Sequence, residues 1–269
     1  MSAIERRIAD FILDNAHLLR DYSSQQLASA LGISQSSVVK FSQKIGFKGY
    51  PDLKFSVGEA LARSGQGDAP QPLAEQPADD FTQLEESLRR SKIAAQEETR
   101  LVTPREALER AVALLDCAGT VYVCGLGEDG LCAREFALRL SLLGMVTVHQ
   151  TDPVLMMASL SSSRAGDVLV LFSEHGKRPE LSQVGRQFQD GKGKVVSLTR
   201  HTSNPLRAHA DVALLVSAHD PVPCVEQLLY RHALQELLDF VYVLLCHGNA
   251  DRRKQLDINL ERMRHMIHS

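Results

Sequence analysis

Two polar loops in the second half of the chain carry side chains that could bind a small ligand. One follows the apolar run 168–172 and reads SEHGKRPE, so a hydroxyl, an imidazole and two cations stand together. The other follows the apolar run 121–124 and reads GLGEDG at the start of an expected helix. Glycines there let backbone N–H groups approach an anion at a helix N-terminus. The candidate effector-binding residues are Gly125, Gly127, Glu128, Asp129, Ser173, His175, Gly176, Lys177, Arg178 and Glu226.

These residue types leave several kinds of site open. The glycine spacing loosely matches the dinucleotide pattern G-x-G-x-x-G, but Glu128 and Asp129 inside the loop would repel a pyrophosphate, and a tight structural turn is the alternative. An isomerase needs a general base near the substrate carbon, and Glu226 and His175 are the candidates. Neither has an identifiable partner, so we predict no catalytic residue. The position of the second loop after the central strand favours a binding pocket over a solvated charged loop.

A third polar set lies near the N-terminus, in SQQLASALGISQSSVVKFSQ at 24–43. Gly32 stands where a left-handed backbone ends a first short helix, and Ser34 is a good N-cap for a second. Val38, Phe41 and Ile45 recur at helical spacing and are expected to point inward. The outward residues then suit a helix-turn-helix that enters the DNA major groove, where Gln can read adenine. The candidate DNA-binding residues are Ser34, Gln35, Ser36, Ser37, Lys40, Lys44 and Lys48; an ordinary helical hairpin is the alternative.

Helical patterns and a compositional change define the elements around this segment. Residues 4–19 and 51–61 read as amphipathic helices that complete a small helical core. Residues 64–80 are rich in Gly, Pro, Gln and Asp and read as a linker. Residues 81–102 and 104–117 read as two further helices, with Thr103 as the N-cap of the second. We therefore predict a helix-turn-helix domain at 1–63, a linker at 64–80 and a second domain at 81–269.

The second domain alternates short apolar runs with helical patterns. The expected strands are 121–124, 145–149, 168–172, 194–198 and 212–216, and a long helix covers 225–246. This alternation predicts an α/β fold with a doubly wound five-stranded parallel sheet. Ligands of such sheets bind at the carboxyl ends of the strands, where both polar loops begin.

Composition excludes several classes of protein. The chain has 269 residues, 44% of them hydrophobic, and a net charge of −3, so only a locally basic module would bind DNA. The five cysteines contain no C-x-x-C pair, which predicts reduced thiols in a cytoplasmic protein without a disulfide framework or metal site. No apolar run approaches the ~18 residues of a membrane span, so we expect no membrane association. We expect no cofactor.

The sequence resembles the RpiR/MurR family of bacterial transcriptional regulators. The N-terminal SQQLASALGISQSSVVKFSQKIGFKGYPDLK carries the specific part of the resemblance, and VYVCGLG and LLYRHALQELLDFVYV are similar to the family's sugar isomerase (SIS) domain. The resemblance implies a cytoplasmic, oligomeric regulator of sugar catabolism that is switched by a phosphosugar. Similar SIS domains carry S-x-S-G-x-T after the third strand, whereas His175 and Arg178 replace the second Ser and the Thr here. Asp129 stands where the first loop usually offers a Ser.

We therefore predict a DNA-binding transcriptional regulator, not an enzyme, of sugar or amino-sugar metabolism. Its expected partners are a double-stranded DNA operator, a small carbohydrate or phosphosugar effector, and further copies of itself in a dimer or tetramer. Leu228, Leu229, Tyr230 and the terminal helix are the expected interface. The mixed charge of the loops favours a zwitterionic or amino-sugar ligand, or weak phosphosugar binding. The alternatives are an isomerase-type SIS enzyme and a regulator that has lost its effector site.

Overall fold

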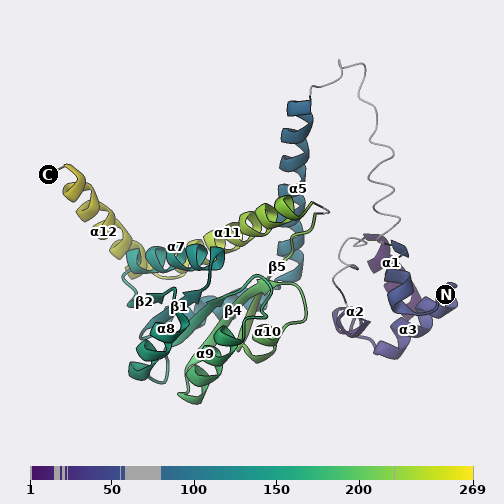
Figure 1. Ribbon diagram of the computed structural model, residues 1–269, viewed down its shortest axis with the longest axis horizontal. Coiled ribbons are helices and arrows are strands. Elements are labelled where there is room, and N and C mark those ends of the chain that lie inside the picture. Colours follow the sequence, from purple (N-terminus) through teal and green to yellow (C-terminus); the bar gives the residue numbers. More distant parts are fainter. Residues whose placement is uncertain are drawn as a thin grey trace. The chain divides into compact units, whose positions relative to one another are not determined.

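The computed structural model describes residues 2–14, 19, 22, 24–54, 56–57, 80–220 and 222–268 (Figure 1). The chain divides into two compact units, Met1–Thr82 and Gln83–Ser269, and each is described by itself. The predicted linker lies outside the described residues except for Asp80, the first residue of helix α5 (Asp80–Val102).

The N-terminal unit is a small helical bundle. It contains α1 (Ala3–Asp14), α2 (Ser24–Ala30) and α3 (Gln35–Lys44), and residues 50–54 and 56–57 are also helical. Ile8, Leu27 and Val38 are fully buried between the helices. The Tyr50 hydroxyl donates to the Tyr22 carbonyl at 2.9 Å and closes the bundle from the fourth helical segment. Residues 15–18 and 58–61 of the predicted helices lie outside the described part.

The turn between α2 and α3 forms as the residue types require. Gly32 has a φ of +59°, which glycine adopts without steric cost, and the Ile33 N–H returns to the Ala28 carbonyl. Ser34 is the N-cap of α3, and its hydroxyl accepts from the Ser37 N–H at 3.2 Å. The prediction for Ile45 was wrong, because this side chain is 42% exposed beyond the end of α3.

The second unit is built on five parallel strands in the order β2-β1-β3-β4-β5. The strands are β1 (Val121–Gly125), β2 (Thr147–Gln150), β3 (Val168–Phe172), β4 (Lys194–Arg200) and β5 (Val212–Val216). The chain passes from β1 to β2 on one side and then back to β3 on the other side of β1. The strand order therefore reverses between β1 and β3, which confirms the doubly wound sheet and places the switch point there.

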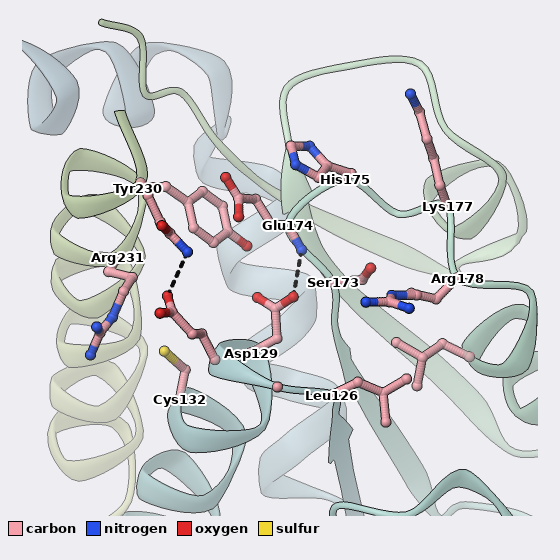
Figure 2. Close-up of a pocket in the computed structure, with 14 residues that line it drawn as sticks. Leu126, Asp129, Cys132, Ser173, Glu174, His175, Lys177, Arg178, Tyr230 and Arg231 are labelled. Atoms are coloured by element: carbon pink, nitrogen blue, oxygen red, sulfur yellow. Dashed lines mark hydrogen bonds between the residues drawn. The ribbon is translucent and has the colours of Figure 1, made fainter. Parts of the chain in front are cut away.

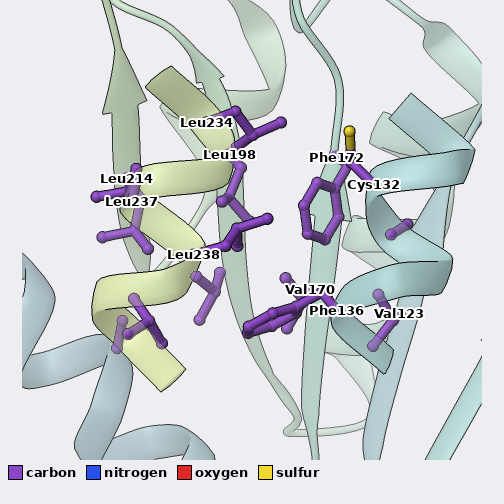
Figure 3. Packing of buried hydrophobic residues seen from close by; sticks show 14 of the residues in the cluster. Val123, Cys132, Phe136, Val170, Phe172, Leu198, Leu214, Leu234, Leu237 and Leu238 are labelled. Carbon is purple, nitrogen blue, oxygen red and sulfur yellow. The ribbon is translucent and has the colours of Figure 1, made fainter. Parts of the chain in front are cut away.

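Helices cover both faces of this sheet, so its central strands are buried throughout. One face packs against α5, α6 (Arg105–Asp116), α7 (Glu128–Leu142) and α11 (Pro223–Gly248). Figure 3 shows Phe136 of α7 and Leu238 of α11 on this face, among the side chains of the cluster that contains Val170 and Leu198. The other face packs against α8 (Pro153–Ser159), α9 (Pro179–Asp190) and α10 (Pro205–His209). Each face supplies an apolar core, which stabilises the sheet that carries the loops.

Residues at the end of helix α5 also form hydrogen bonds with backbone groups at the outer edge of the sheet. Thr103 donates to the Leu215 carbonyl at 2.6 Å and accepts from the Leu215 N–H at 2.9 Å. Thr99 makes the same pair of bonds with Ser217, both at 3.0 Å. The N-cap prediction for Thr103 was therefore wrong: Pro104 is the N-cap of α6, and the Thr103 hydroxyl pairs with the edge strand β5 instead. These bonds attach α5 to the edge strand of the sheet.

The terminal helix α12 (Ala250–His268) follows α11 and projects away from the sheet (Figure 1). Its first turns are held to the body of the unit, since Arg252 contacts Asp116 at 3.1 Å and Asn259 donates to the Leu142 carbonyl at 2.9 Å. None of the helices in the described ranges has the length and apolar run that a membrane crossing requires.

Candidate functional site

A pocket of about 440 Å³ opens at the carboxyl ends of β1 and β3. Its walls come from the start of α7, the loop between β3 and α9, and one turn of α11 (Figure 2). Small-molecule sites commonly have volumes of this order, and the switch point of a doubly wound sheet is their usual place. The pocket thus lies where the sequence predicted it, and no side chain fills it.

Most of the predicted effector-binding residues meet in this pocket. Gly127, Glu128, Asp129, Ser173, His175, Lys177 and Arg178 line it. Sequence reasoning missed seven further lining residues, which are Leu126, Cys132, Glu174, Leu181, Gln227, Tyr230 and Arg231. Glu174 and Leu126 lie within the predicted loops, so their position was a usable signal. Gln227, Tyr230 and Arg231 come from α11, and no local motif indicates that this helix crosses above the two loops.

Three predicted residues do not line the pocket. Gly125 ends β1, and a β-carbon there would come within 2.6 Å of the Asp129 carbonyl oxygen. Gly176 is buried with a φ of +61° and packs against Asn204. Glu226 is the clearest correction, because its carboxylate is occupied elsewhere: Arg200 donates to it at 2.8 Å and His219 lies 3.2 Å from it. It is therefore not available as a general base.

A buried arginine behind the pocket contacts both the β3–α9 loop and the start of α11. Arg200, at the end of β4, is 8% exposed and contacts Glu174 and Glu226 at 2.6 and 2.8 Å. It also donates to the Ala218 carbonyl at 2.7 Å, and its guanidinium lies 5.5 Å from the centre of the Tyr230 ring. Two carboxylates compensate its charge, as a buried cation requires. Arg200 thus holds Glu174 and Tyr230 in place without lining the pocket itself.

The β3–α9 loop uses its own serine to form its turn. The Ser173 hydroxyl accepts from the Gly176 N–H at 3.2 Å, and Ser173 is only 3% exposed. The helix that follows begins at Pro179, and neither α9 nor α7 has a side-chain N-cap. Both helices therefore present uncapped N-termini at the pocket, which favour an anionic ligand group.

Charges of both signs line the pocket. Lys177, Arg178 and Arg231 are exposed and form no salt bridge within the described part of the chain. Asp129 is half-buried and accepts from the Glu174 N–H at 2.9 Å, while Glu128 accepts from Gln227 at 2.8 Å. Burial raises the pKa of Asp129, and the nearby carboxylates of Glu174 and Glu128 add to that effect. Cationic and anionic groups could therefore both contact one ligand.

The candidate DNA-binding face lies on α3 and the residues after it. Gln35, Ser36, Lys40, Lys44 and Lys48 are exposed. The Gln35 amide donates to the Ser24 hydroxyl at 2.9 Å, so it is oriented by the start of α2. Lys44 is 2.8 Å from Glu5 of α1, with 61% of its side chain exposed. Ser34 and Ser37 hydroxyls lie 2.8 Å apart at the helix start. Lys40 is the cation on α3 that no described residue pairs with.

The described part of the chain contains no cluster of three or more His, Cys, Asp or Glu side chains that could hold a metal ion. The structure combines a small unit with a helix-turn-helix arrangement and a doubly wound unit with an open pocket. This combination is typical of DNA-binding regulators with a sensory domain.

Comparison with known proteins identifies the family. A profile of the rpiR-family helix-turn-helix domain matches residues 1–64, and a profile of the SIS domain matches residues 114–236. The uncharacterized HTH-type transcriptional regulator YfhH of Escherichia coli K12 is 33% identical over 264 residues, 97% of this chain and 91% of the relative. The chain belongs to the RpiR family of helix-turn-helix transcriptional regulators, as predicted.

Two solved structures share the fold. NanR of Vibrio vulnificus has 22% identity and a TM-score of 0.64, and the match covers 99% of this chain and 94% of NanR. The sugar isomerase domain of an RpiR transcription factor from Sphaerobacter thermophilus has 19% identity and a TM-score of 0.59 over 67% of this chain and 99% of that domain. The second likeness confirms the SIS-like architecture of the sheet unit.

Proposed function

We propose that this transcriptional regulator is switched by a small carbohydrate derivative that carries an anionic group and binds in the pocket at β1 and β3. The observation that carries the proposal is the open pocket in which the unpaired cations Lys177 and Arg178 stand beside the uncapped N-terminus of α9. The Vibrio vulnificus NanR structure, which shares the fold, is a complex with ManNAc-6P and supports this class of ligand. Arg178 and Lys177 are expected to contact the anionic group, replacing the hydroxyls of similar SIS domains.

Thermal-shift measurements on the full-length protein test this proposal. The probes are glucose 6-phosphate, glucosamine 6-phosphate, N-acetylmannosamine 6-phosphate and inorganic phosphate. A ligand that binds only the folded state raises the melting temperature, by an amount equivalent to about 2.7 kcal/mol at 100 times its Kd. The shift should vanish in Arg178→Ala and persist in Arg186→Ala, an exposed arginine on the same helix outside the pocket. The proposal fails if no probe shifts wild type, or if a shift survives loss of both His175 and Arg178.

We also propose that the sheet unit associates with a second copy through α7 and α11. Leu131 and Leu228 are 60% and 47% exposed and border one groove between these helices. Leu228 was predicted at an interface, but the same prediction for Leu229 and Tyr230 was wrong, because they are 1% and 2% exposed inside the unit's own core. Paired helix-turn-helix units on half-sites a whole number of duplex turns apart increase the specificity of binding.

Light scattering of the full-length protein tests the association. Leu131→Asp with Leu228→Asp should convert a dimer or tetramer to a smaller species at micromolar concentration. The control is Val154→Asp, because Val154 is 75% exposed on α8, on the other face of the sheet. A wild-type monomer, or an oligomer that the double variant leaves intact, would contradict this interface.

We propose that the start of α3 reads the operator, with Gln35 at base edges and Lys40 at a phosphate. Genomic DNA fragments selected by the wild-type protein supply the target. Lys40→Ala should reduce the slope of log K against log salt concentration by about 0.9, since one phosphate contact is lost, while Gln35→Ala should relax base preference. Lys92→Ala in α5 is the charge-matched control. Unchanged salt dependence and unchanged base preference in the two variants would place the recognition face elsewhere.

A further inference from the structure

Two polar groups at the inner wall of the pocket have hydrogen-bonding capacity that the described residues do not use. The Asp129 carboxylate accepts one hydrogen bond, from the Glu174 N–H at 2.9 Å, and no lysine or arginine forms a salt bridge with it in the described chain. The imidazole of His175 is the nearby group that attracts its charge. Tyr230 is 2% exposed, and its hydroxyl has no partner among the described residues. In Figure 2 the phenol points from α11 toward Asp129 and Glu174.

Asp129 differs from the other carboxylates around the pocket because it is half-buried and forms no salt bridge in the described chain, whereas Glu128 is exposed. Glu174 is bound by Arg200 at 2.6 Å, and Glu128 accepts from Gln227 at 2.8 Å. A half-buried carboxylate with a single donor is only partly compensated, so a further donor would stabilise it. Lys177 and Arg178 do not supply that donor, because they are exposed at the other end of the pocket (Figure 2).

The ring of Tyr230 is held in one orientation by Arg200. The Arg200 guanidinium lies 5.5 Å from the centre of its ring, and Arg200 is itself fixed by Glu174 and Glu226. Burial raises the pKa of Tyr230 well above its ordinary value, so the phenol remains a proton donor. A buried donor without a partner loses the free energy of one hydrogen bond, and native structures rarely leave such a group without a role.

We propose that Asp129 and Tyr230 determine ligand specificity by accepting and donating one hydrogen bond each. This inference rests on the proposed carbohydrate-binding function. The pocket then takes a sugar derivative whose anionic group lies at Lys177 and Arg178. Its other end presents a group that both donates and accepts, such as a hydroxyl or an N-acyl amide. A second anion at this wall is excluded by the Asp129 charge.

The Tyr230 hydroxyl is shielded from solvent, so a ligand reaches it only after a neighbouring side chain moves. We expect Asp129 to be the side chain that moves, because a single hydrogen bond holds it.

Isothermal titration of the full-length protein with four probes tests the assignment. N-acetylglucosamine 6-phosphate carries the amide, glucose 6-phosphate a hydroxyl, glucosamine 6-phosphate an ammonium, and inorganic phosphate none of these. Tyr230→Phe should weaken the best-bound amide or hydroxyl ligand about 2- to 10-fold, the range of one neutral hydrogen bond. Asp129→Asn should weaken it about 10- to 100-fold, because a charged acceptor is lost, and should tighten inorganic phosphate. Tyr242→Phe, on the same helix outside the pocket, is the control.

The melting temperature of Tyr230→Phe separates a ligand-binding role from a structural one. The variant should melt no lower than wild type without ligand, because no hydrogen bond is removed. A lower melting temperature would show that the hydroxyl has a structural partner and would overturn the inference. Equal affinity of a sugar phosphate for wild type, Tyr230→Phe and Asp129→Asn would overturn the specificity assignment and leave the proposed function standing. If no probe binds wild type, both fail.

Discussion

The candidate DNA-binding face and the pocket differ in the distance along the chain over which their residues are brought together. Gln35 is oriented by Ser24, and Ser34 caps a helix through Ser37, so the start of α3 is positioned by contacts within 11 residues. The pocket depends on the Glu174–Asp129 bond across 45 residues and the Gln227–Glu128 bond across 99. We therefore expect the start of α3 to tolerate changes in the surrounding structure that the pocket does not.

The largest effect should come from the buried cation behind the pocket. Arg200→Met removes the partner of Glu174 and Glu226 and should lower the free energy of unfolding of the sheet unit by about 3 kcal/mol, the lower end of the range for a broken buried ion pair, because both carboxylates are partly exposed. Urea denaturation followed by circular dichroism measures it. Arg105→Met, whose side chain is 85% exposed, is the matched control. A loss below about 1 kcal/mol would indicate that the pocket loops hold their positions without Arg200.

A second test is the response of the sheet unit to acid, through His201. Burial, with the Arg207 charge adding to it, lowers the pKa of His201 to about 4. A folded-state pKa below the unfolded value of about 6.5 means that the unfolded state binds the proton first. His201 thus contributes stability above pH 6.5 that is lost as the pH falls toward 4, by at most about 3 kcal/mol. Thermal melts between pH 7 and pH 4 should show this loss in wild type, and His201→Gln should flatten it.

A third test addresses the attachment of α5 to the edge strand. Thr103→Val leaves the Leu215 N–H and carbonyl without their partner and should lower the free energy of unfolding by about 2 kcal/mol. Thr103→Ser keeps the hydroxyl and should retain most of the stability. Chemical denaturation measures both. Equal stability of the Val variant and wild type would mean that the edge of β5 is satisfied in another way.

The smallest effect is expected in the helix-turn-helix unit. Ser34→Ala removes the N-cap of α3, which typically costs about 1 kcal/mol. The melting temperature of the sheet unit should not change, since the cap is a local contact. Gln43→Ala, exposed in the last turn of α3, is the control. A Ser34→Ala loss as large as that of Thr103→Val would remove the distinction between a locally and a distantly built site.

Sequence patterns predicted the elements well where burial alone decides them. β3 and β5 begin and end at the predicted residues, because an apolar run between polar loops fits a strand that is covered on both faces. Predictions failed where a polar side chain had two possible partners. Thr103 has the residue type of an N-cap, yet its hydroxyl pairs with β5, 112 residues away. Glu226 has the residue type of a general base, yet its carboxylate binds Arg200.

Residue types at short, regular spacing were enough to predict the helix-turn-helix, the parallel sheet and the two loops that face the pocket. That Gln227, Tyr230 and Arg231 complete the pocket follows from the packing of the folded chain, since α11 reaches it across the switch point. Packing also sets which charges face the pocket. Arg200 and Glu226 neutralise each other behind the wall, while Asp129 and Arg178 remain in the pocket. Pairing between distant charged side chains is set by packing, and no local pattern encodes it.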